Sequence, residues 1–144
     1  MTDQEIFEHW KGEDAPLLPI LQAFHDRDEH ISESAIRSIA SALKIPVAEL
    51  FATVTFYHHF SRDLPGKTAP RVCTGNVCSL NGGKELLESL QGEGATEMPC
   101  AGRCDDMIPV IRGDNVYVGK DAASLTNRSS PLPAENPGKL EECV

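Results

Sequence analysis

The sequence predicts an α+β fold in which a bundle of helices is followed by a small α/β domain. Residues 1–66 contain no cysteine and repeat apolar side chains at three- and four-residue spacings, as amphipathic helices do. From Pro70 onward the pattern changes to short apolar runs separated by turn residues. We therefore expect a helical bundle over residues 1–66, an α/β domain over residues 67–120 and an extended tail over residues 121–144.

Capping residues and prolines divide the N-terminal part into four short helices. Thr2 and Glu5 have the spacing of a capping box, which predicts a first helix at the start of the chain. Pro16 suits the first turn of a second helix, and Ser32 is the expected N-cap of a third. Pro46 ends the third helix and begins a fourth. Helices this short depend on tertiary packing, so we expect one bundle.

The second part has the order strand, helix, strand and hairpin. A short strand is predicted at residues 71–72, running directly into Cys73. Residues 82–90 have helical spacing of their leucines, and residues 95–98 form a second candidate strand. Residues 107–118 alternate apolar and polar side chains around a turn-forming segment, which predicts a hairpin. This order of elements is that of a small α/β domain.

Charge and hydropathy exclude two classes of protein. The formal net charge of −9 argues against nucleic-acid binding, for which a basic surface is the expected signature. No apolar run approaches the ~20 residues that a transmembrane helix needs, so we expect no direct membrane insertion. The N-terminus is acidic, unlike a secretory signal. We expect a cytoplasmic protein.

Four of the five cysteines form two close pairs. Cys73 and Cys78 are separated by four residues, and Cys100 and Cys104 by three, with 21 residues between the pairs. In a reducing cytosol, clustered cysteines are more often metal ligands or catalytic groups than disulfides. Both pairs lie among small residues and glycines, which allow two loops to converge on one centre. The fifth cysteine, Cys143, lies in the tail, and we expect it to be a spare thiol.

Three other kinds of metal site have ligand patterns that differ from the cysteine pattern of this chain. Structural zinc sites usually draw on tighter cysteine pairs, and a plant-type ferredoxin has a further cysteine after the first pair. A Rieske centre needs two histidines as ligands, and no histidine lies between Cys73 and Cys104. By elimination, an all-cysteine [2Fe–2S] cluster fits best. Zinc and redox-active thiols stay open as alternatives.

The sequence lacks the signatures of a catalytic site. The segment around Gly82 and Gly83 does not have P-loop spacing, and no dinucleotide fingerprint is present. Neither a nucleophile with its base nor an acid–base pair is evident. Arg103 lies between two cysteines, where it is either a cation that favours a reduced cluster or a solvated, partner-facing side chain. His58 and His59 are expected at a surface or an interface.

Residues 17–118 resemble a known family. The chain is similar to the small thioredoxin-like [2Fe–2S] subunit of NADH:quinone oxidoreductase, which also occurs in NAD-reducing hydrogenases and NAD-dependent formate dehydrogenases. The matching segments are Leu18–Gln22, Lys44–Leu50, Ala52–Phe60, Cys73-Thr74-Gly75-x-x-Cys78, Cys100-x-Gly102-x-Cys104 and Pro109–Val110.

The resemblance implies a thioredoxin-like α/β domain whose cluster ligands are Cys73, Cys78, Cys100 and Cys104. It implies an electron-transfer subunit without an active site of its own, which exchanges single electrons with FMN in a flavin- and NAD(H)-binding iron–sulfur subunit. A free-standing thioredoxin-like ferredoxin is the alternative, but such carriers lack the helical part. The face near residues 51–60 is expected to dock on the partner. Thioredoxin-like folds also suggest a cis peptide bond before Pro109.

Overall fold

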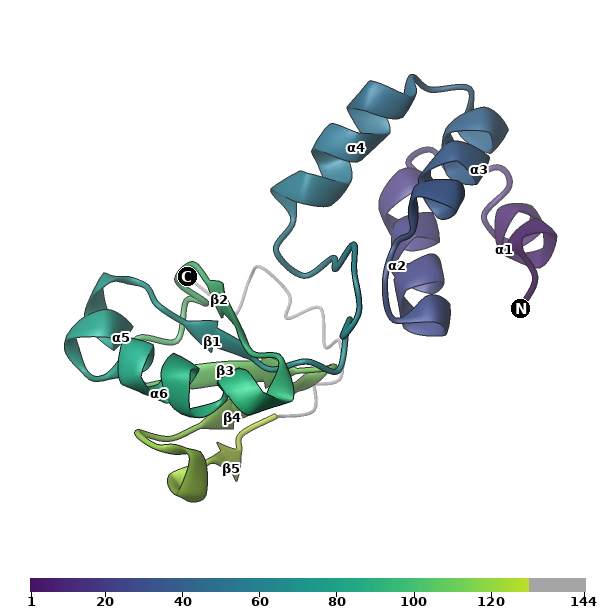
Figure 1. Cartoon of the computed structure of the whole chain (residues 1–144). Coiled ribbons are helices and arrows are strands. Elements are labelled where there is room, and N and C mark those ends of the chain that lie inside the picture. Colours follow the sequence, from purple (N-terminus) through teal and green to yellow (C-terminus); the bar gives the residue numbers. More distant parts are fainter. Residues whose placement is uncertain (130–144) are drawn as a thin grey trace, which may run out of the picture.

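The protein is described by a computed structural model that covers residues 1–129. Four helices precede a five-stranded mixed sheet, so the predicted α+β fold is confirmed (Figure 1). The helical part contains α1 (Asp3–His9), α2 (Leu17–Asp28), α3 (Glu33–Leu43) and α4 (Val47–Phe56). The second part contains β1 (Arg71–Cys73), α5 (Asn76–Leu80), α6 (Gly83–Ser89), η1 (Gln91–Glu93), β2 (Thr96–Met98), β3 (Pro109–Arg112), β4 (Asn115–Val118), η2 (Ala122–Ser124) and β5 (Thr126–Asn127).

The helices begin where the capping residues predict. The backbone N–H of Glu5 donates to Thr2 Oγ1, and the Glu5 carboxylate accepts from the Thr2 N–H at 2.6 Å, which completes the capping box. Ser32 Oγ accepts from the backbone N–H of Ala35 and caps α3. Pro46 is the N-cap of α4. The four helices and their starting points are therefore confirmed.

A single apolar core holds the four helices together. Its buried members are Ile6, Ile20, Leu21, Phe24, Ile31, Ala35, Ile36, Ile39, Ala40, Leu50 and Val54. Burial of each large aliphatic side chain contributes about 1.5–3 kcal/mol relative to exposure. This contribution explains why helices of 7–12 residues persist. Among the described residues, no helix is both long and apolar enough to cross a bilayer.

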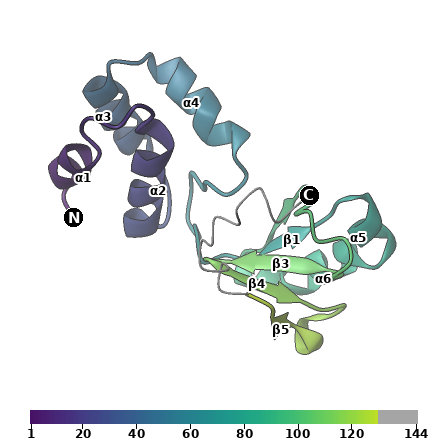
Figure 2. The same ribbon diagram turned by 180° about the vertical axis from the view of Figure 1, so that it is seen from behind.

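The sheet has the strand order β2-β1-β3-β4-β5. β1 runs parallel to β2, while the other neighbouring strands are antiparallel. α5 and α6 lie over one face of the sheet, and the view from behind shows the strands in front of them (Figures 1 and 2). A second apolar core lies in this part and includes Val72, Leu86, Leu90, Ile108 and Val110. The predicted strand–helix–strand and hairpin are thus present.

Three local details differ from the sequence predictions. Cys78 lies on helix α5, whereas a loop was expected there, because a five-residue helix is too short to show helical periodicity. β5 adds Thr126–Asn127 to the sheet, within the segment predicted as an extended tail. The prediction of a cis bond before Pro109 is wrong, since the cis peptide bonds within residues 1–129 are Leu64–Pro65 and Met107–Ile108.

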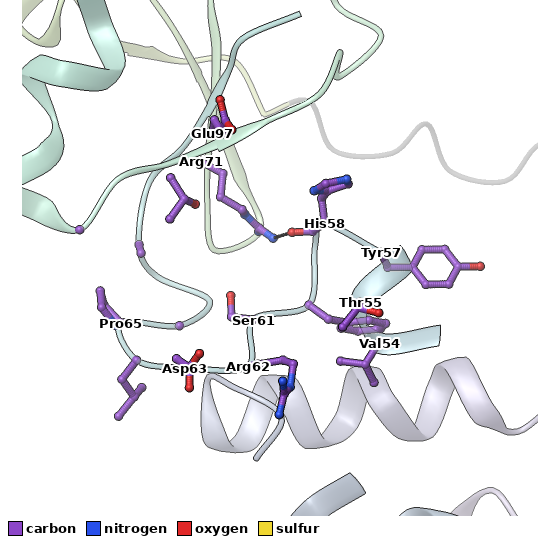
Figure 3. Close-up of a pocket in the computed structure, with 16 residues that line it drawn as sticks. Val54, Thr55, Tyr57, His58, Ser61, Arg62, Asp63, Pro65, Arg71 and Glu97 are labelled. Atoms are coloured by element: carbon purple, nitrogen blue, oxygen red, sulfur yellow. Dashed lines mark hydrogen bonds between the residues drawn. The ribbon is translucent and has the colours of Figure 1, made fainter. Parts of the chain in front are cut away.

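Polar contacts join the helical part, and the linker between α4 and β1 (residues 57–70), to the sheet. Lys67 Nζ forms ion pairs with Asp26 of α2 at 2.6 Å and with Asp114 of the β3–β4 turn at 2.9 Å. Arg71 of β1 donates from Nη1 to the carbonyl oxygen of His58 at 2.9 Å (Figure 3). The same Nη1 donates to the carbonyl oxygen of His59 at 2.6 Å. The segment after α4 is therefore fixed to both parts of the chain.

His25 of α2 is a fully buried neutral histidine at this junction. Its Nε2 accepts from the backbone N–H of Ser61 at 3.1 Å. Burial, followed by the nearby His59 and Arg71, lowers the pKa of His25 to about 4. The imidazole is therefore uncharged at neutral pH, and with Nε2 as acceptor its proton resides on Nδ1.

Candidate metal centre

The first cysteine pair, Cys73 and Cys78, lies inside the α/β part. Cys73 is the last residue of β1 and Cys78 is on α5, and both are 1% exposed. The backbone N–H of Thr74 donates to Met98 O at 3.0 Å, which holds the start of the intervening loop against β2. Strand pairing and helix packing thus fix both thiols.

The second cysteine pair, Cys100 and Cys104, lies at the surface in the loop between β2 and β3. Both residues are exposed, and their Sγ atoms are 3.4 Å apart. The backbone N–H of Gly102 donates to Cys100 Sγ at 3.4 Å. Gly102 has φ +74°, a left-handed conformation that glycine adopts without the penalty of a side chain. The tight turn at Gly102 therefore depends on glycine.

Two further glycines allow close packing around the cysteines. A Cβ atom at Gly75 would lie 3.1 Å from Cys100 Cβ, so the glycine lets the second cysteine loop approach the first. A Cβ atom at Gly83 would lie 2.7 Å from the carbonyl oxygen of Cys73 and 2.9 Å from that of Cys78. Gly83 therefore sets the distance between α6 and the backbone of the first cysteine pair.

Gly83→Ala should destabilise the α/β part. Alanine gains up to about 1 kcal/mol of helix propensity over glycine, but overpacking against fixed backbone typically costs about 1–3 kcal/mol. Because the clash involves two backbone carbonyls, we expect the clash to dominate and Tm to fall by about 5 °C. Gly92→Ala is the matched control, since nothing lies within 4 Å of its Cβ position. A Gly83→Ala Tm equal to that of Gly92→Ala would contradict this account.

The thiols differ in acidity. Burial, reinforced by Cys73, raises the pKa of Cys78 to about 12. The Gly102 N–H and the Cys104 thiol stabilise the thiolate of Cys100 and lower its pKa, while the adjacent Cys100 raises the pKa of Cys104. Cys100, on the surface, is therefore a stronger acid than Cys78, and a cation is needed to hold the thiolate of Cys78.

The two cysteine pairs lie close enough to influence each other, since Cys104 and Cys100 both help to raise the pKa of Cys78. In the part of the chain that the structure describes, no three or more His, Cys, Asp or Glu side chains converge closely enough to hold a single metal ion. A binuclear centre instead needs two ligands at each metal, which is the arrangement of the two cysteine pairs.

The arginine and the two histidines that were considered from sequence differ in exposure and in hydrogen-bond partners. Arg103 donates to Asp106 Oδ2 at 2.9 Å and is about one-third exposed, so its charge is already paired. His58 is exposed, whereas His59 is half-buried against Arg71. Arg71 was not singled out from sequence, although its position two residues before Cys73 places both side chains on one face of a strand. Cys143 lies outside the described residues.

Comparison with known proteins gives one family. The sequence pattern of the thioredoxin-like [2Fe–2S] ferredoxins matches residues 3–127, which is most of the chain. The match includes the helical part as well as both cysteine pairs.

Individual relatives are distant in sequence, at 24–27% identity, and each is named as a subunit of an oxidoreductase or a hydrogenase. An NADH-quinone oxidoreductase subunit of Mycobacterium tuberculosis is 27% identical over 88 residues, covering 61% of this chain and 35% of its own length. The corresponding subunit of Rickettsia prowazekii is 25% identical over 130 residues, covering 80% of this chain and 73% of its own. NAD-reducing hydrogenase HoxS subunit alpha of Cupriavidus necator is 24% identical, covering 94% of this chain and 26% of its own. The chain thus spans about a third or less of the length of several relatives.

Proposed function

Because this chain belongs to the thioredoxin-like [2Fe–2S] ferredoxin family, we propose that it is an electron-transfer subunit of an NAD(H)-linked oxidoreductase. In this proposal Cys73, Cys78, Cys100 and Cys104 hold one [2Fe–2S] cluster. The terminal electron donor or acceptor, whether hydrogen, formate or quinone, is left open by the proposal.

The observation that carries the proposal is the arrangement of the cysteines in two pairs. Four thiolates are the donor set of a [2Fe–2S] cluster, with two at each iron. Gly75 allows the close approach of the two cysteine loops that a shared cluster needs. The thiol pKa values also fit, because the raised pKa of Cys78 leaves a buried thiol that gains most from a cation.

The residues of this chain give the site a buried and an exposed side. When bound, the cluster supplies one-electron chemistry, whereas a flavin handles hydride as a two-electron event. Cys73 and Cys78 keep water away from one side of the centre, since both are buried. Cys100 and Cys104 are at the surface, where a redox partner can come close to the centre. We therefore expect electrons to enter and leave the cluster on the side of Cys100 and Cys104.

A larger partner subunit is part of the proposal. Relatives carry the word subunit in their names, and HoxS subunit alpha contains a matching segment within a much longer chain. We propose a flavin- and NAD(H)-binding iron–sulfur subunit, which holds the FMN, as the neighbour. Because the sequence has no evident acid–base or nucleophile set, the proposal assigns catalysis to the neighbour. The free-standing ferredoxin is the weaker candidate, because it does not account for the helical part.

Purification of the native assembly tests this function. A flavoprotein should co-purify with this chain, and NADH should reduce the assembly and give a rhombic S = 1/2 electron paramagnetic resonance signal from its [2Fe–2S] centre. The same preparation carrying Cys100→Ser in this chain should lose or alter that signal while the flavin is still reduced. If the chain purifies alone as a stable monomer, and no flavoprotein accompanies it, the free-carrier function would replace the one proposed.

A further inference from the structure

We propose that Arg71 is the counter-charge of the cluster and raises its reduction potential. This inference rests on the proposed function and names a residue that tunes the same site. Arg71 is on β1, two residues before Cys73, and its role would be electrostatic, acting on the cluster without being one of its ligands.

Arg71 is a buried cation without a carboxylate partner. It is 6% exposed. Among the described residues, Arg71 and His25 are the two buried polar or charged residues. The side-chain hydrogen bonds of Arg71 go to the carbonyl oxygens of His58 and His59 and to His59 Nδ1 at 3.1 Å. No ion pair of residues 1–129 includes it. Asp114, the carboxylate with a resolved influence on Arg71, is engaged by Lys67 at 2.9 Å.

The surroundings of Arg71 leave its positive charge uncompensated. Burial lowers the pKa of His59 and of His25, so both neighbouring imidazoles are neutral at pH 7. An arginine stays protonated in proteins even when burial lowers its pKa. A buried unpaired charge is costly, and proteins usually pair it. Asp63 and Glu97 line one cavity with Arg71 but form no ion pair with it, and Cys100 lines a second cavity with Arg71. A thiolate held at Cys100 is therefore an anion that the guanidinium can stabilise.

The sheet places Arg71 on the side of the cysteines. Arg71 and Cys73 share a face of β1, with Cα atoms roughly 7 Å apart along the strand. The strand register puts Cys73 beside Met98 of β2 and Arg71 beside Ile111 of β3. A cavity of about 190 Å³ is lined by both of these neighbours and also by Arg71, His59, Pro99 and Cys100. The guanidinium therefore has a low-dielectric surrounding that it shares with the second cysteine loop.

This position determines the sign of the effect. An oxidised [2Fe–2S] cluster on four thiolates is a dianion, and reduction makes it a trianion. A fixed positive charge stabilises the trianion more than the dianion, so it raises the potential. Arg103, which was considered for this role from sequence, is paired with Asp106 and more exposed, so its field is weaker. Figure 3 shows how Arg71 reaches from β1 to the linker, where it lies away from bulk water.

A redox titration of the full-length protein with its cluster tests the inference. Arg71→Gln removes the charge but keeps hydrogen-bond donors, and Arg71→Lys keeps the charge. At a fixed potential, Arg71→Gln should lower the ratio of reduced to oxidised cluster about tenfold, a shift of about 59 mV for one electron. Arg71→Lys should change that ratio less than about threefold. The control is Arg112→Met on β3. Arg112 and its partner Glu93 are both accessible to solvent, so water screens the change in charge, and the ratio of reduced to oxidised cluster should stay nearly the same.

Each outcome of the titration either supports or overturns the electrostatic role of Arg71. An unshifted potential in Arg71→Gln with an intact cluster overturns the proposal, and so does an equal shift in Arg71→Gln and Arg71→Lys. If Arg71→Gln fails to retain a cluster, retention in Arg71→Lys at a near-native potential supports a requirement for charge. Cluster loss in both variants assigns Arg71 to the fold and overturns the electrostatic role. A wild-type protein that binds no cluster contradicts the proposed function itself.

Discussion

Serine at any one of Cys73, Cys78, Cys100 and Cys104 is expected to abolish or distort the cluster, while Cys143→Ser should leave it unchanged. An alkoxide is a poorer ligand for iron than a thiolate, because soft sulfur donors favour iron–sulfur clusters. Serine at the buried positions should have the larger effect, since Cys73 and Cys78 are 1% exposed and the lost ligand cannot be replaced by water. The visible absorption spectrum and the iron content measure the result.

Cluster loss should also weaken the α/β part. Metal binding contributes folding free energy to small domains, and the sheet core around the cysteines is limited to short strands. Thermal unfolding of the variants should therefore show a lower Tm than the wild-type protein, with Cys143→Ser matching the wild type. Loss of the cluster in Cys143→Ser, with retention after serine substitution of one of the four, would overturn the ligand assignment.

Phe56→Asp is expected to weaken assembly with the proposed flavin-binding subunit by about 30-fold or more, the loss typical of a central aromatic interface residue. The reason is a set of exposed apolar side chains on α4 and directly after it, which we call the α4 face: Val47, Phe51, Phe56 and Tyr57, with Phe56 at 73% exposure. A shallow apolar hollow of about 390 Å³ lies beside Tyr57, between α2 and the linker. Exposed apolar surface of this kind marks interaction sites.

The assembly experiment has a matched control. Ser41→Asp places the same charge at an exposed polar position of α3 that is not part of the α4 face, and it should leave the affinity unchanged. Both variants should keep the wild-type cluster spectrum, because the substituted helices lie outside the α/β part. The affinity can be measured by titrating the purified partner subunit. Equal affinity of Phe56→Asp and the wild type would show that the partner docks elsewhere.

The sequence predicted those parts of the fold that local chemistry specifies. Thr2, Ser32 and Pro46 fix helix starts through their own side chains or ring, so each could be assigned from a few neighbouring residues. α5 and β5 were missed because segments of five and two residues have too few positions to show a period. The cis bond was expected from a fold-level likeness and not from residues near Pro109, and it was placed at the wrong bond.

For the candidate site, the sequence shows the cysteine pairs but not their surroundings. Spacing identified two cysteine pairs, yet nothing in the spacing says that Cys73 is buried and Cys100 exposed, because that depends on where β1 lies in the sheet. Arg103 was considered because it lies between two cysteines. The structure pairs it with Asp106 and leaves Arg71 as the unpaired buried cation. Pairing and burial are tertiary properties, so sequence alone could not rank the two arginines.

The most direct test of the account is the iron and acid-labile sulfide content of the purified full-length protein. A [2Fe–2S] cluster on the two cysteine pairs requires equal amounts, about two irons and two sulfides per chain. The account predicts this ratio in a red-brown protein whose dithionite-reduced form has an S = 1/2 signal. One zinc per chain without sulfide, in a colourless protein, would contradict it.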